Sequence, residues 1–399
     1  MSPSVDRRFQ SAEEEPSPSR LWITGLGAQY PPYAMDPEAV DRFATRFFNV
    51  ESPGLKKLLE INKNTGIEAR SSIRTYEHGF GAQSEPPSIV EIDKFFRQFG
   101  VDLTAQACKK ALREWGGERS SITHTIGVTC TTQGNPGYDL LVRRKLGLRP
   151  DVDRMLLHGV GCAGGLAIMR AAAQIASGAT ARRRPARILC FACELCTPNA
   201  RCDLADAEMA AAEDVSIAGA LFSDGAAAFV LCNSIGLEEE TEPLFELMEW
   251  GTGTLPGTEE HMGFITGPIG FRTVLTRDVP NHTKEAVKPM FDELLPSYAA
   301  RASGRAMTQD DFDWALHPGG EAIIENVKQV MSLNDHQLRA TREIYRTRGN
   351  SSSPTVLIVL DKLRTMGRGS DHVVATSFGP GLQIEMAMMR RCRDGTDDM

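Results

Sequence analysis

The sequence lacks the long apolar segments that membrane and secreted proteins carry. No run of about 18 apolar residues occurs, and the first 20 residues, MSPSVDRRFQSAEEEPSPSR, are polar and rich in Pro and Ser. They contain no apolar core of a signal peptide. We therefore expect a cytoplasmic protein without a membrane span.

The sequence also has no disulfide framework and no basic stripe. Its nine cysteines are irregularly spaced and odd in number, which predicts reduced thiols, those of the CxxC at Cys193 and Cys196 included. Lys and Arg number 44 against 52 Asp and Glu, for a net charge of -8, so nucleic acid is excluded as a partner. Zinc-ligand spacing is absent, and no metal site is predicted.

What the 399 residues do contain is enough apolar content, 41%, for a large core. Short apolar runs such as LWITGLG and RILCFAC read as buried strands. They alternate with helix-like stretches, LTAQACKKALREW and GLAIMRAAAQIASG, the latter predicted to end at a Gly178 cap. This alternation predicts an α/β fold.

The organisation along the chain suggests a tail and two halves. Residues 1–20 are predicted to form a flexible N-terminal tail. The acidic run LEEETE, Leu237–Glu242, marks a boundary between residues 21–236 and 237–399. HGVGCAGGLAIMRAAAQIASG in the first half and RGNSSSPTVLIVLDKLRTMG in the second share one order: turn, reactive side chain, apolar helix. Two equivalent turns would then face each other across one pocket.

Cys162 is the candidate nucleophile. It lies in GVGCAGG, Gly159–Gly165, directly before a predicted helix. Unpaired N–H groups and the positive end of a helix dipole favour thiolate over thiol, and a charged His nearby would lower the thiol pKa further. Taken alone, the residue is better explained as a small apolar Cys that fills a packed turn.

Two further motifs carry polar side chains in Gly- and Ser-rich turns. His317 follows a strand-like run in WALHPGG. Asn350 lies in RGNSSSPT, where a helix N-cap is the plain alternative.

In their order, GC-A-GG, LFSDGAAA, LHPGG, GNSSS and SFGPGL resemble the type III polyketide synthases of the chalcone and stilbene synthase superfamily. The resemblance covers about Leu21 to Met386. CTTQGNPGYD and the MGF of Met262–Phe264 are similar to the fungal branch. This resemblance implies a thiolase-type duplicated αβαβα five-layer fold and a homodimer.

The resemblance also implies a catalytic triad of Cys162, His317 and Asn350. Cys162 would carry the acyl chain, while His317 and Asn350 would hold the enolate formed when malonyl-CoA loses CO₂. The substrates would be acyl-CoA and malonyl-CoA, with no cofactor, no metal and no acyl carrier protein. Further site residues implied by the family pattern are Phe222, Asn135, Asn199, Gly379, Pro380 and Gly381 around the cavity, and Lys57, Lys63, Gly319 and Ala322 for coenzyme A.

The chain departs from the family pattern in two places. Glu60 and Asn64 stand where further basic residues would grip the coenzyme A phosphates, and adjacent Lys63 is a substitute. Asn135 lies near the position at which plant enzymes of the family carry a Met. In those enzymes that Met reaches into the neighbouring subunit's cavity.

The function expected is iterative condensation on a fatty or β-ketoacyl starter and closure to an alkyl α-pyrone. Alternatives are an alkylresorcinol or resorcylic acid synthase, a ketoacyl synthase III-like enzyme, and a non-catalytic acyl-CoA-binding protein of the same fold.

Overall fold

The computed structural model describes residues 20–77, 83–367 and 369–393, so the predicted tail lies outside the described residues except for Arg20. Nine strands pair in the order β11-β12-β13-β8-β1-β7-β6-β4-β5. Their bounds are β1 (Leu21–Gln29), β4 (His124–Val128), β5 (Asp153–Leu157), β6 (Arg187–Leu195), β7 (Asp224–Asn233), β8 (Phe245–Thr254), β11 (Phe312–Leu316), β12 (His372–Gly379) and β13 (Gln383–Arg391).

The strand order contains the same pattern twice. β1 and β7 are antiparallel, β7 and β6 are antiparallel, and β6 and β4 are parallel. β8, β13, β12 and β11 repeat this series of pairings. β1 and β8 meet through only Leu21–Ile23, so the repeated groups form two sheets joined at a narrow contact. The acidic run Leu237–Glu242 lies in the irregular connection between β7 and β8.

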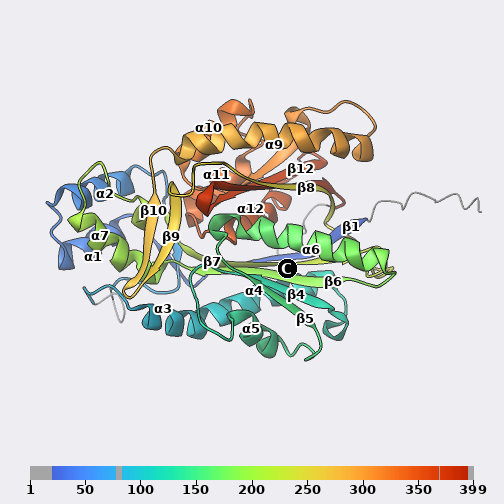
Figure 1. Cartoon of the computed structure of the whole chain (residues 1–399), viewed down its shortest axis with the longest axis horizontal. Coiled ribbons are helices and arrows are strands. Elements are labelled where there is room, and N and C mark those ends of the chain that lie inside the picture. Colours follow the sequence, from blue (N-terminus) through green and yellow to red (C-terminus); the bar gives the residue numbers. More distant parts are fainter. Residues whose placement is uncertain (1–19, 78–82, 368, 394–399) are drawn as a thin grey trace, which may run out of the picture.

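Helices complete five layers, as Figure 1 shows. α6 (Gly164–Ala181) and α12 (Thr355–Arg364) lie between the sheets, with α11 (Arg339–Arg348) beside α12. α4 (Val101–Trp115) and α5 (Tyr138–Leu146) cover one outer face, and α9 (Val279–Ala302) and α10 (Glu321–Val330) the other. The fold is thus the thiolase-type α/β arrangement that the resemblance implied.

Strand periodicity decides which layer each side chain reaches. On β6, Ile188 and Cys190 join the core around α6 and α12, whereas Leu189 and Phe191 join the core under α4 and α5. Successive strand residues point to opposite faces, and both faces here are covered by helices. This is why the strands read as continuous apolar runs in the sequence.

The two middle helices approach closely at glycines. A Cβ on Gly165 would lie 2.5 Å from the Ser353 carbonyl oxygen, which forbids any side chain there. The helix itself runs on to Ala181, so the predicted cap at Gly178 is wrong. Gly178 has open space where a Cβ would stand, and glycine inside a helix only weakens it.

Smaller elements gather at one end of the layers, on the left of Figure 1, and build a wall of the site. They are β2 (Tyr33–Met35), α1 (Glu38–Phe47), α2 (Pro53–Lys63), β3 (Arg70–Ser72), α3 (Ile89–Phe95), α7 (Ala200–Met209), α8 (Ala218–Leu221) and the hairpin of β9 (Met262–Gly267) and β10 (Gly270–Leu275).

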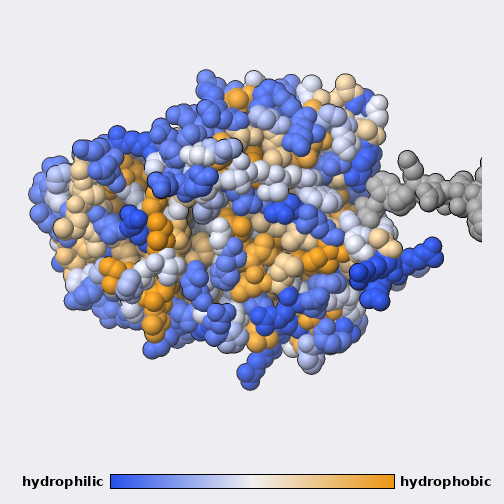
Figure 2. All heavy atoms as spheres, viewed as in Figure 1, coloured by the Kyte–Doolittle hydropathy of each residue, from blue (hydrophilic) through white to orange (hydrophobic). Residues whose placement is uncertain are grey.

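Apolar residues also reach the surface. On the face shown in Figure 2 they gather along the region of α6 and β6 and at the β9–β10 hairpin. Ile265 and Ile269 of the hairpin and Met155 of β5 are exposed. Among the helices of the described residues, none is both long and apolar enough to span a membrane.

Candidate active site

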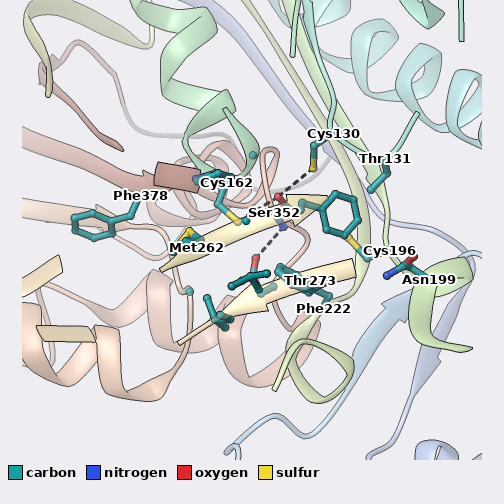
Figure 3. A pocket seen from close by; sticks show the side chains of 18 of the residues that line it. Cys130, Thr131, Cys162, Cys196, Asn199, Phe222, Met262, Thr273, Ser352 and Phe378 are labelled. Atoms are coloured by element: carbon teal, nitrogen blue, oxygen red, sulfur yellow. Dashed lines mark hydrogen bonds between the residues drawn. The ribbon is translucent and has the colours of Figure 1, made fainter. Parts of the chain in front are cut away.

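One inner cavity collects the three residues of the implied triad. It lies between the two catalytic turns and the β9–β10 hairpin (Figure 3), and its empty space measures about 760 Å³ when the adjoining open solvent is included. Its lining consists of Cys130, Thr131, Gly161, Cys162, Cys196, Asn199, Asp203, Phe222, Met262, Gly263, Phe264, Thr273, Val274, Leu275, His317, Gly319, Ile323, Asn350, Ser352, Phe378 and Pro380.

Cys162 lies in a single 3₁₀ turn, Gly161–Ala163, that leads directly into α6. The predicted position at a helix start is therefore confirmed. Its Sγ lies 3.2 Å from the Ser352 Oγ of the opposite turn. The two turns that share a sequence pattern thus meet across the cavity, as the pattern predicted.

The thiol is not activated in the way the helix start suggested. Burial raises the pKa of Cys162 to about 12, although the hydrogen bond with Ser352 acts in the opposite direction. The free-energy cost of removing a thiolate from water exceeds the stabilisation that the helix N-terminus gives it. Cys162 is therefore a neutral thiol in this structure and needs a base to ionise it.

His317 stands at the end of β11 and is 2% exposed. Its backbone N–H donates to the Thr376 carbonyl, 2.8 Å away. Neither ring nitrogen has a hydrogen-bond partner within the described part of the chain. Burial lowers the pKa of the imidazole to about 3, so the ring is neutral and can both accept and donate a proton.

Gly319 keeps one side of this imidazole open. A Cβ there would lie 3.6 Å from the ring Cδ2 and 2.8 Å from the Ile323 side chain. Gly319 therefore leaves room beside the His317 ring, where it lines the cavity.

Asn350 is fixed at its backbone and at one side-chain atom. Its N–H donates to the Leu221 carbonyl at 3.1 Å, and its own carbonyl accepts from the Ser223 N–H at 2.8 Å. The side-chain Oδ1 accepts from the Ser352 N–H at 2.8 Å. The Nδ2 amide remains as a donor. The alternative of an N-cap is wrong, since α12 begins five residues later with Pro354 at its cap.

The Gly379-Pro380-Gly381 loop packs against the nucleophile turn. A Cβ on Gly379 would lie 2.3 Å from the Val160 carbonyl oxygen, and one on Gly161 would lie 2.5 Å from the Pro380 Cδ. Gly381 has a φ of 66°. The glycines of both motifs therefore serve one close contact, which holds the Cys162 turn against the second half of the chain.

An outer hollow adjoins the inner cavity and shares Leu275, Gly319 and Ile323 with it. Lys57 and Ala322, both expected to contact coenzyme A, line this hollow. Lys63 does not line it, because its Nζ lies 3.1 Å from Asp41 instead.

Arg277 lines the outer hollow and was not recognised in the sequence. It follows β10, more than 200 residues from Lys57 along the chain. Only the folded hairpin brings the two cations to one rim.

The remaining expected residues divide into two groups. Phe222 and Asn199 line the inner cavity. Asn199 holds the hairpin, because its side chain pairs with both the N–H and the carbonyl of Phe271 at 2.9 Å. Asn135 is exposed beside a cis peptide bond to Pro136 and is not part of this cavity wall.

A buried carboxylate organises the wall behind the nucleophile and was missed in the sequence. Glu194 accepts from the Thr131 Oγ1 at 2.7 Å, the Ser353 Oγ at 2.6 Å and the Cys130 N–H at 3.0 Å. These contacts tie the 129–131 segment to the GNSSS turn. Figure 3 shows Ser352 between Cys162 and Cys130. The only signal in the sequence was a charged residue inside an apolar strand.

Family comparisons agree with this geometry. The model of chalcone and stilbene synthases, N-terminal domain, matches residues 55–234, and that of the C-terminal domain matches residues 247–393. The chain therefore belongs to the chalcone and stilbene synthase family, whose members are condensing acyltransferases.

Relatives in this family include fungal type III polyketide synthases, and the chain is a type III polyketide synthase. It is 64% identical over 392 residues to the type III polyketide synthase pspB of Penicillium soppii, covering 95% of this chain and 98% of the relative. It is 34% identical over 375 residues to the acylalkylpyrone synthase csyB of Aspergillus oryzae, covering 92% and 94%.

Two of the matching solved structures cover nearly the whole chain. The fungal type III polyketide synthase ORAS superposes with a TM-score of 0.90 at 39% identity, covering 93% of this chain and 99% of that one. CsyB complexed with CoA-SH superposes with a TM-score of 0.88 at 33% identity, covering 93% and 100%.

Proposed function

We propose that this enzyme loads an acyl starter from coenzyme A onto Cys162, extends it with malonyl-CoA and closes the product to an alkyl α-pyrone. The observation that carries the proposal is the convergence of the Cys162 thiol, the His317 imidazole and the Asn350 side-chain amide on a largely apolar cavity. A relative named as an acylalkylpyrone synthase supports the pyrone over the resorcinol.

Loading begins with proton transfer from Cys162 to His317. Both groups are neutral, and the transfer creates a thiolate and an imidazolium that stabilise each other. The thiolate attacks the thioester carbonyl, the C–S bond to coenzyme A breaks, and the coenzyme A thiolate takes the proton.

Extension uses His317 and Asn350 as donors. The malonyl thioester oxygen accepts from the imidazole N–H and from the Asn350 Nδ2, since the Oδ1 of that side chain is already occupied. These donors stabilise the enolate that forms when CO₂ leaves. The enolate carbon attacks the acyl group on Cys162 and releases its thiolate. These steps call for coenzyme A thioesters alone, without a metal, a cofactor or an acyl carrier protein.

The hairpin gives the cavity its apolar wall. Met262, Phe264, Val274 and Leu275 line it, and Phe264 stacks on Phe271 with ring centroids 4.3 Å apart. Such a wall suits an alkyl chain better than a charged starter.

A direct assay tests the proposal. Purified enzyme is incubated with acyl-CoAs of graded length and labelled malonyl-CoA, and products are identified by mass. Alkyl α-pyrones are the expected result, and reactions without starter serve as the control. Free β-keto acids alone would contradict the cyclisation. A lack of malonyl-CoA decarboxylation would favour the non-catalytic binding protein.

The outer hollow predicts a change in coenzyme A affinity. Replacing Arg277 with alanine should raise the KM for acyl-CoA about three- to tenfold at low salt, because an exposed cation near a phosphate contributes about 1 kcal/mol. Steady-state kinetics at two salt concentrations measure this. The N-acetylcysteamine thioester has no phosphate, so its KM should stay unchanged.

A Lys63 variant, measured in the same assay, tests whether the family pattern or the observed hollow describes the coenzyme A site. Lys63→Ala should leave the KM near the parent value, since Lys63 pairs with Asp41. A larger effect from Lys63 than from Arg277 would show that the family pattern, and not the observed hollow, describes the coenzyme A site.

The homodimer is part of the proposal. β5 is the last strand of its sheet, and it exposes Met155 at 44%. An edge strand with an exposed apolar side chain is a natural surface for a second copy. Asn135 would then contribute to the partner's cavity, which sedimentation and crystal structures of the oligomer can test.

A further inference from the structure

One carboxyl group in the inner cavity has no part in loading or extension. Asp203 lies in the first turn of α7 and is 8% exposed. Its Oδ1 accepts from the Thr273 Oγ1 of β10 at 3.3 Å, and both residues line the inner cavity. Figure 3 places Thr273 on the hairpin strand below Cys162 and Ser352. A buried carboxyl is costly, and its presence beside a substrate cavity calls for a chemical reason.

Asp203 also reaches a second space on the outer side of α7. Asp203 and Thr273 line a hollow of about 680 Å³, open solvent included, together with Asp206, Asp214 and Arg272. The carboxyl therefore stands in the partition between the reaction cavity and an outer, polar hollow. A group in this position can exchange a proton with either side.

The charges around Asp203 set its titration. Burial raises its pKa to about 7, and the carboxylate of Asp206 on the same helix adds to this. Hydrogen bonds from Thr273 and Asn199 and the guanidinium of Arg70 on β3 act in the opposite direction. The nearby Tyr76 and Cys202 have raised pKa values, so they stay neutral. Near pH 7 the carboxyl is thus present in both forms, which is what acid–base catalysis requires.

We propose that Asp203 is a general acid–base catalyst of the ring-closing step, an inference that rests on the proposed function. The extended chain first returns from coenzyme A to Cys162 by the same thioester exchange as in loading, and coenzyme A leaves as the thiol. The Asp203 carboxylate then takes the proton from the enol hydroxyl of that chain. That enol oxygen forms a C–O bond to the thioester carbonyl carbon, the C–S bond breaks, and the electron pair leaves on the Cys162 sulfur. Asp203 then returns its proton to that sulfur, directly or through solvent, so the lactone and the free thiol balance the step.

Asp203→Asn tests this, because the amide keeps the shape and cannot ionise. Enzyme acylated in a single turnover is followed by intact-protein mass for loading and by release of the ring product. We expect loading and malonyl-CoA decarboxylation within about twofold of the parent, and ring release about 10²-fold slower. In the parent, ring release should rise with pH through about 7 and then level, since the carboxylate is the active form. The variant should show no such rise.

Two neighbours make the test independent of one variant's folding. Thr273→Val removes a hydrogen bond that favours the carboxylate, so the midpoint of the pH profile should move up. Asp206→Asn removes a negative charge outside the inner cavity, so the midpoint should move down. Opposite shifts support the assignment. Ring release by Asp203→Asn at the parent rate, or midpoints unmoved in both neighbours, would overturn it. Failure of the parent to load or decarboxylate would instead overturn the proposed function.

Discussion

Cys162→Ala is expected to abolish ring products, with a loss of about 10³-fold or more, because the acyl chain then has no covalent attachment. Intact-protein mass after incubation with acyl-CoA should show no acyl adduct. Malonyl-CoA decarboxylation should persist, since the donors on His317 and Asn350 are unchanged.

The chain offers a matched control for this variant. Cys392 is an exposed thiol that does not line the inner cavity, so Cys392→Ala should load and turn over like the parent. Ring products from Cys162→Ala at a rate near the parent's would rule out the covalent route. An adduct that survives in Cys162→Ala would point to another cavity thiol, Cys130 or Cys196.

His317→Ala should slow both loading and malonyl-CoA decarboxylation, the latter by about 10²- to 10³-fold, as expected for the loss of one oxyanion donor. His317→Gln keeps a donor but no base, so decarboxylation should recover in part while loading stays slow. Labelled CO₂ release and adduct mass separate the two steps.

The pH dependence gives a second readout of the same residue. Burial holds the pKa of His317 to about 3, so decarboxylation by the parent should be independent of pH between about 5 and 8 through this group. A loss of decarboxylation centred near pH 6.5 would instead mean that His317 titrates as an ordinary exposed histidine.

Most of the fold could be predicted because apolar runs and turn motifs can be recognised in the sequence without knowing the tertiary contacts. Apolar runs such as RILCFAC are continuous since both faces of their strands are buried. The ordered motifs around Cys162, His317 and Asn350 identified the family because each is a turn with a geometric need for glycine or serine. The end of α6 was missed, since the helix continues through the exposed Gly178 to Ala181.

The site's electrostatics could not be predicted from local rules. A helix start favours a thiolate, yet burial decides the pKa of Cys162, and burial depends on residues from both halves of the chain. In the same way, Lys63 lies next to the expected position but pairs with Asp41, while Arg277 reaches the hollow from a distant hairpin. Neither the pairing of Lys63 nor the position of Arg277 follows from how far these residues lie from the expected site along the chain.

The shared middle layer has a consequence for how this enzyme loses its structure. α6 belongs to the first half and α12 to the second, and both contribute to one core. Neither half can cover the inner face of its sheet and helix alone, so a fragment ending before β8 would expose that face and aggregate. Because the two catalytic turns lead into these helices, heat or denaturant should disrupt the site and the fold in one cooperative transition.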